Sequence, residues 1–189
     1  MNEAFNYWLI GIQYLRLAEA ACNELVGREN ASGVVFIGAV DWDEYLEATK
    51  WSDHSIGIAI LFNFFHGIEV LLKGFLSLKA ASPPRHHRLS EILMEFEKEY
   101  PGTRLSSLVR EYTEELCPYS PLGQFFRTNA ISVDEWYEAL KYPESKSGRS
   151  YRHTDLKYGG LDTVHFWKSI GNTAILLRKE AVQLSRSID

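Results

Sequence analysis

Hydrophobic residues recur every three or four positions along most of this chain, the spacing that places them on one face of a helix. The pattern predicts a first amphipathic helix over residues 3–26, with Gly27 as its terminator. A second helix, over 55–79, is apolar around most of its girth, which is typical of a helix at the centre of a domain. A third long helix is predicted over 162–185. These three segments are the expected framework of the core.

Two shorter helices are expected between the second and third long ones. Apolar periodicity predicts them over 89–100 and 103–116, separated by a Pro-Gly pair that stops the first. Thr103 stands where its hydroxyl can cap the second. Both helices present a single apolar face, so we expect them to pack on the central helix.

The remaining segments are less regular. Ser132 and Glu135 have the spacing of a capping box, which predicts a short helix over 132–140. Residues 41–46 are also expected to be a short helix, with acids favouring its first turn. Residues 34–37 have the composition of a strand but no evident partner, so the conformation of 31–40 stays open.

Together these segments predict an all-α protein. We expect one domain over residues 1–189, an up-and-down bundle of five to seven helices. It would carry an irregular insertion at about 28–53 and a polar, basic loop at about 141–160, in which a small hairpin is an alternative.

Composition narrows the class of protein. Hydrophobic residues make up 46% of the 189 and aromatics 13%, which allows a core of large rings or an aromatic interface. Cys22 and Cys117 form neither a disulfide framework nor a zinc motif. The N-terminal residues lack the signature of a signal peptide, and the longest apolar runs are about half of the roughly 20 residues that a bilayer requires. A cytoplasmic protein with no membrane partner is expected.

Charge is distributed unevenly. The net charge is −5, yet residues 141–157 hold five bases and two acids, a local excess that attracts phosphate. Basic and aromatic residues alternate in and beside this segment, as in proteins that hold single-stranded RNA. The candidate residues there are Lys141, Tyr142, Arg149, Tyr151, Arg152, His153 and Tyr158. A solvated loop explains the same composition.

Three motifs occur in the order found in one known family. Glu69 and Lys73 stand four residues apart on the most apolar helix, and His87 precedes Leu89 at the start of the next. Leu-Lys-Tyr-Pro follows at 140–143. Over roughly residues 55–185 the chain resembles the HEPN family, with lysine in place of arginine in the last motif.

The resemblance implies a helical bundle that forms homodimers and works with RNA, nucleotides or an antitoxin or nucleotidyltransferase partner. Active members cleave RNA without metal or cofactor, through an arginine and a histidine separated by four to six residues. Arg149 and His153 have only three residues between them. The first hypothesis is therefore a binding or regulatory domain for RNA or a nucleotide, within a toxin–antitoxin or defence system.

Two other functions stay open. One is a metal-independent ribonuclease whose rearranged site combines Arg149, Arg152 and His153 as catalytic residues across a dimer. The other is a helical protein-interaction module without a nucleic-acid role, which the acidic net charge favours.

Each predicted ligand-binding residue also has a structural interpretation. The predicted set is Glu69, Lys73, His87, Lys141, Tyr142 and Tyr151. Glu69 and Lys73 would form an ordinary i,i+4 ion pair if exposed, and His87 would cap or pack a turn. His66 with Glu69, and Asp162 with His165, have the spacing of metal ligands on a helix, but no second motif completes a site, so no metal is expected.

Overall fold

The computed structural model describes residues 3–35, 38–79 and 83–188. In these residues the regular structure is helical, and the only β pairing is one antiparallel bridge between Glu144 and Ser150. The all-α prediction is confirmed. The α-helices are α1 (Glu3–Gly27), α2 (Trp42–Thr49), α3 (Asp53–Leu76), α4 (Leu89–Glu99), α5 (Arg104–Thr113), α6 (Pro121–Asn129), α7 (Trp136–Ala139) and α8 (Val164–Arg186), with 3₁₀ turns η1 (Val133–Glu135), η2 (His153–Leu156) and η3 (Leu161–Thr163).

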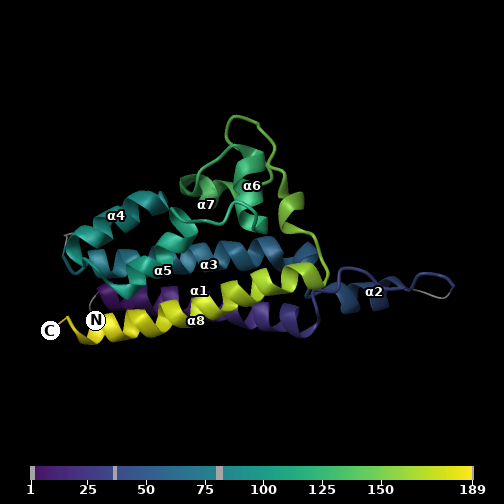
Figure 1. The fold of residues 1–189 in the computed structure, drawn as a ribbon, viewed down its shortest axis with the longest axis horizontal. Coiled ribbons are helices and arrows are strands. Elements are labelled where there is room, and N and C mark those ends of the chain that lie inside the picture. Colours follow the sequence, from purple (N-terminus) through teal and green to yellow (C-terminus); the bar gives the residue numbers. More distant parts are fainter. Residues whose placement is uncertain (1–2, 36–37, 80–82, 189) are drawn as a thin grey trace.

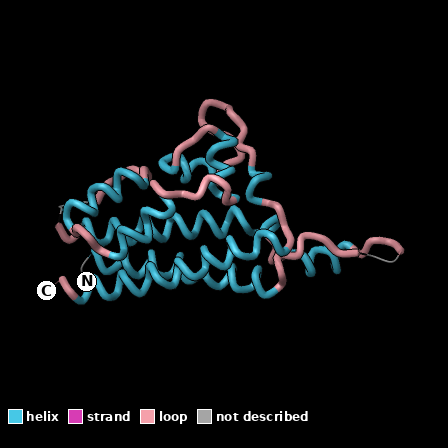
Figure 2. The backbone as a smooth tube through the Cα atoms, in the orientation of Figure 1, coloured by secondary structure: helices cyan, strands magenta, loops and turns pink. Residues whose placement is uncertain are grey.

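The three long helices pack together as a bundle, in which α1 contacts both α3 and α8 and crosses behind α8 in the view of Figures 1 and 2. Helices α3 and α8 both run antiparallel to α1, and α1 contacts both of them along its length. Small residues allow the close approach of α1 and α3. A Cβ at Gly67 would lie 2.7 Å from Cγ of Leu15, so glycine is required there.

Helix α3 is the central element, as its apolar girth predicts. Sixteen of its residues are buried. The segment Trp42–Leu76 contains an 18-residue window that is apolar enough to span a membrane, with a mean hydropathy of 1.8, but 61% of that window is buried in the bundle. Packing against the neighbouring helices therefore accounts for its apolarity.

Aromatic rings fill the space between the helices. Phe65 stacks on Trp136 with ring centroids 5.6 Å apart, and Phe75 meets Phe96 edge to face at 5.8 Å. Trp167 of α8 is fully buried as well. Of the two roles that the aromatic content allows, these rings serve the core.

A buried polar network joins the loops at one end of the bundle. Asn30, in the left-handed turn after α1 (φ 51°), donates through its amide to Asp53 at 2.8 Å and to Thr163 at 2.5 Å. The Asp53 carboxylate also accepts from the Gly159 amide at 2.9 Å and from the Trp167 indole at 3.4 Å. Asn30, Gly159 and Trp167 are thus tied directly to the first turn of α3, and Thr163 is tied to it through Asn30.

The shorter helices pack on the bundle or project from it. Helix α4 packs on α3, α5 packs on α4 and α8, and α6, α7 and the loop after them form a raised lobe (Figure 1). Helix α2 projects past the end of the bundle on an arm. Its N-cap, Asp41, accepts from the backbone amides of Asp43 and Glu44, as acids in the first turn predict.

Several local predictions are confirmed and others are corrected. The Ser132–Glu135 capping box is present, and Thr103 caps α5 by accepting from Ser106. Helix α5 ends at Thr113 rather than near 116, and α6 was not predicted at all. The hairpin considered for 142–160 is reduced to its single bridge. Residues 34–35 are irregular, and 36–37 lie outside the described residues.

Candidate functional site around Glu69 and His87

The predicted pair on α3 lies inside the protein. Glu69 is 1% exposed and Lys73 is 6% exposed, and their charged atoms lie 2.6 Å apart. The Lys73 ammonium also donates to the carbonyl of His86 at 2.7 Å. A buried pair needs such additional hydrogen bonds to offset the loss of hydration. The pair therefore fixes the segment before α4 on the middle of the bundle.

His87 completes the contacts of the same carboxylate. Its Nδ1 lies 2.9 Å from Oε1 and 3.1 Å from Oε2 of Glu69. An ionised carboxylate only accepts, so Nδ1 is the donor, and whenever the ring is neutral Nε2 is its proton-accepting nitrogen. The His87 side chain is 40% exposed, and among the described residues Nε2 has no hydrogen-bond partner. A carboxylate thus orients an imidazole whose second nitrogen is available.

The carboxylate stays ionised despite its burial. Burial by itself raises the pKa of Glu69, but His66, Lys73 and His87 together offset it and lower the pKa from 4.5 to about 2. His66, one turn earlier on α3, holds its Nδ1 3.6 Å from Oε2. That nitrogen is buried and has no hydrogen-bond partner within the described residues. Glu69 is the negative centre of a cluster of three basic side chains.

Aromatic and basic residues of the raised lobe extend this cluster outward. The ring of Tyr137 stacks on His87 with centroids 3.7 Å apart and planes 6° from parallel. Lys141 donates to the Tyr137 hydroxyl at 3.0 Å and lies 5.3 Å from the centroid of Tyr142. These tyrosine contacts raise the pKa of Lys141. Trp136 secures the arrangement by donating from its indole to the carbonyl of His87 at 3.0 Å.

An open cleft borders the buried pair. It has a volume of about 480 Å³ and is lined by His66, Glu69, Lys73 and Arg85, together with Tyr7 from α1. A neighbouring hollow of about 500 Å³ shares Arg85 and adds two lysines, Lys79 and Lys98, as well as Glu95 and Glu99. The cleft is large enough for a small ligand and has basic groups on its walls.

The predicted catalytic trio is arranged differently. His153 Nε2 donates to the backbone carbonyl of Ala139 at 2.6 Å, and its ring stacks on Phe125 at 5.4 Å. Arg149 is exposed, 4.0 Å from Glu135. In this single chain His153 is a packing residue, and its catalytic role stays a prediction.

The remaining predicted residues of that loop also serve the fold in part. The backbone amide of Arg152 donates to the Asn129 side chain at 2.8 Å, which anchors the loop on α6. Tyr151 is 7% exposed, so its ring has little surface on which a base could stack. Tyr142 is exposed and remains accessible.

The structure thus brings together Glu69, Lys73, His87, Lys141 and Tyr142, and it adds Tyr137 and His66. Tyr137 carried no signal in the sequence, because its place against His87 depends on a contact between residues 50 positions apart. In the described part of the chain no three His, Cys, Asp or Glu residues are grouped so as to hold a metal ion.

A scan against protein-family models, a search of curated proteins and a search of solved structures each found no match.

Proposed function

We propose that this chain is a HEPN-like domain that binds RNA or a nucleotide at the face formed by His87, Tyr137, Lys141 and Tyr142. One observation carries the proposal: an aromatic ring and an imidazole stacked at 3.7 Å lie beside a lysine, and the imidazole contacts Glu69, which lines a cleft with basic walls. Single-stranded nucleic acids are held by aromatic stacking of bases together with cations for phosphates. The net charge of −5 restricts this chemistry to a local face.

Binding is tested by fluorescence anisotropy with a short labelled single-stranded RNA and, separately, a labelled adenine nucleotide, both at low salt. Tyr137→Ala removes the stacked ring and Lys141→Ala removes the cation. Each is expected to weaken binding by about tenfold, in line with the energy of one stacked base or one phosphate contact. Lys168→Ala, an exposed lysine on α8, is the matched control and should bind as the wild type does. The proposal would be refuted if the wild type bound neither the RNA nor the nucleotide.

A second function, metal-independent RNA cleavage, is favoured by the Glu69–His87 contact. An imidazole held at Nδ1 by a carboxylate presents Nε2 as a proton acceptor, the arrangement that general bases use. Nε2 would take the proton of a 2′-hydroxyl, and the 2′-oxygen would attack the adjacent phosphorus. The bond to the 5′-oxygen would break, which leaves a 2′,3′-cyclic phosphate and a 5′-hydroxyl protonated from solvent.

Incubation with RNA in the presence of a chelator tests this second function. Cleavage that is lost in His87→Ala and kept in His153→Ala supports it. The reverse result would favour the rearranged site of Arg149, Arg152 and His153. No cleavage by the wild type leaves binding as the function of this face and removes the enzymatic one.

A further inference from the structure

The arm that carries α2 exposes apolar side chains far from the core. Trp42 and Leu46 are 68% and 61% exposed and stand one turn apart on the same face of α2. Asp43 and Glu47 flank them at the same i,i+4 spacing. Thr49 is the only buried residue of this helix. An amphipathic helix with water on its apolar face is typical of an element that binds a groove elsewhere.

A groove of complementary chemistry lies between α1 and α8. Two adjoining hollows of about 150 and 380 Å³ share Ile12 and Val182 as lining residues. Phe5 and Leu9 add apolar surface to the smaller one, and they are 49% and 46% exposed. The groove therefore has an apolar floor.

The charges of the arm and the groove are opposite. Residues 38–50 hold four carboxylates and one lysine. The groove is bordered by Arg16, Lys179 and Arg186, which are exposed and form no ion pair with any described residue. Opposite charges at the border of an apolar contact steer association and fix its orientation.

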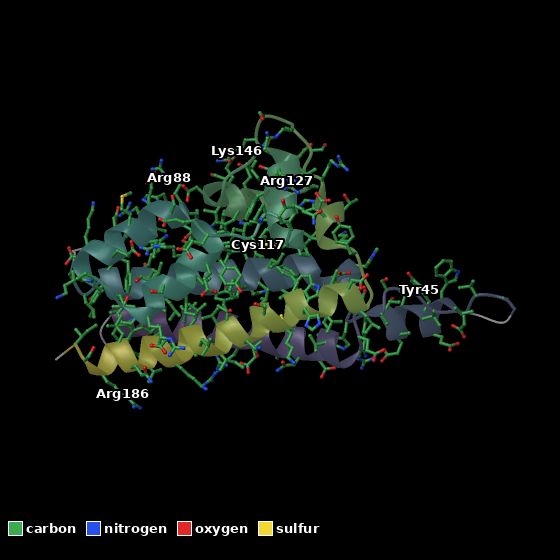
Figure 3. The ribbon with its side chains drawn as sticks, viewed as in Figure 1. Tyr45, Arg88, Cys117, Arg127, Lys146 and Arg186 are labelled. Atoms are coloured by element: carbon green, nitrogen blue, oxygen red, sulfur yellow. The ribbon has the colours of Figure 1, made fainter. Side chains whose placement is uncertain are left out.

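The arm cannot reach the groove of its own chain. Figure 3 shows Tyr45, on the arm, and Arg186, at the groove, at opposite ends of the molecule. Helix α8 is about 34 Å long at 1.5 Å per residue, the arm lies beyond its N-terminal end, and the groove follows its C-terminal half from Ile175 to Arg186. The occupant of the groove must come from another molecule.

We propose that two copies of this chain pair antiparallel, so that the α2 arm of each copy docks in the α1–α8 groove of the other. Because arm and groove lie at opposite ends, a two-fold axis between the α1–α8 faces brings both arm–groove contacts together and closes the assembly at two copies. Trp42 and Leu46 fill the apolar floor, and Asp43 and Glu47 face the basic border. The assembly stands on these contacts and does not depend on binding of RNA.

Sedimentation velocity of the full chain over a range of concentrations tests the assembly through reversal of charge. The wild type is expected to be dimeric. The arm variant Asp43→Lys/Glu47→Lys and the groove variant Lys179→Glu/Arg186→Glu are each expected to dissociate at least about tenfold more readily. An equimolar mixture of the two variants should restore the dimer, because each reversed arm then meets a reversed groove and each native arm a native groove.

The control is Glu111→Lys/Glu115→Lys, which reverses an exposed acid pair of the same spacing away from both surfaces. It should leave the dimer unchanged, and circular dichroism establishes that each variant is folded. A wild type that is monomeric at all concentrations would overturn the proposal, even if an unrelated protein bound the groove. So would variants that dissociate separately but fail to associate when mixed.

Discussion

Helix α3 holds two buried carboxylates, one at its start and one in its second half, and their surroundings differ. Asp53 and Glu69 are each 1% exposed. The Asp53 carboxylate accepts hydrogen bonds from three neutral groups, the side-chain amide of Asn30, the backbone amide of Gly159 and the indole of Trp167. Glu69 is held by Lys73 and His87 and borders an open cleft.

The comparison distinguishes a structural carboxylate from a candidate functional one. Neutral donors around Asp53 use its acceptor capacity and join loops, so nothing remains for a ligand. The groups around Glu69 are basic, and one of them, His87, has a free nitrogen and an exposed side chain. Burial alone therefore does not indicate function; the nature of the partners and the open side of the site do.

The largest expected effect is the loss of stability on replacing Asp53, the carboxylate at the start of α3. Asp53→Ala leaves the amides of Asn30 and Gly159 and the indole of Trp167 without their acceptor in a buried place. We expect a loss of about 4 kcal/mol in the free energy of unfolding. Urea titration followed by circular dichroism measures it. Binding of RNA by the folded fraction should not change, and a selective loss of binding would contradict the assignment of Asp53 as structural.

The next effect is at Glu69. Glu69→Gln removes the charge that compensates Lys73 and is expected to cost about 3 kcal/mol, because an uncompensated ammonium stays buried. In the double variant Glu69→Gln/Lys73→Met most of that stability should return. The same urea titrations give the coupling energy. Equal stability of the single and the double variant would show that the pair is not held together by its charges.

Lowering the pH should remove the contribution of ionised Glu69 to the stability of the fold. Since the pKa of Glu69 is lowered from 4.5 to about 2 in the folded state, its ionised form stabilises the fold above pH 4.5. This contribution is lost as the pH falls from 4.5 towards 2, and amounts to at most about 3 kcal/mol. Thermal unfolding over this interval should therefore show a steeper loss for the wild type than for Glu69→Gln. If the stability of the two proteins fell in parallel with pH, the lowered pKa of Glu69 would be contradicted.

The smallest expected loss of stability concerns Thr163, which belongs to the hydrogen-bond network around Asp53. Thr163→Val keeps the shape of the side chain but removes the hydroxyl that accepts from Asn30 and donates to the Gly160 carbonyl at 3.0 Å. A loss of about 1–2 kcal/mol is expected. Thermal unfolding at neutral pH measures it. If Thr163→Val left the stability unchanged, Asn30 would have found another acceptor in place of the hydroxyl.

Much of the helical framework was predictable, because helix periodicity is a local property of the sequence. The long helices and the capping box at Ser132 and Glu135 follow from spacing alone. Helix α6 was not predicted because it is only nine residues long, although Ser120 and Pro121 form a start signal in the sequence.

The candidate site was predicted only in part. The i,i+4 spacing of Glu69 and Lys73 is visible in the sequence, but their burial depends on what the rest of the chain places over them. His153 and His87 carry similar sequence signals, yet one ring donates to a backbone carbonyl and the other to a buried carboxylate. Which partner each histidine meets is decided by contacts 14 and 18 residues distant along the chain.

Hydrophobic spacing and caps act within a few residues, so the sequence alone predicts that the chain forms helices, where most of them begin and end, and which of them is central. Which polar groups meet inside the bundle, and the separation of the α2 arm from its complementary groove, are set by how the helices pack. Those outcomes depend on burial and on pairs of residues far apart in sequence, whose energies exist only once the helices have packed.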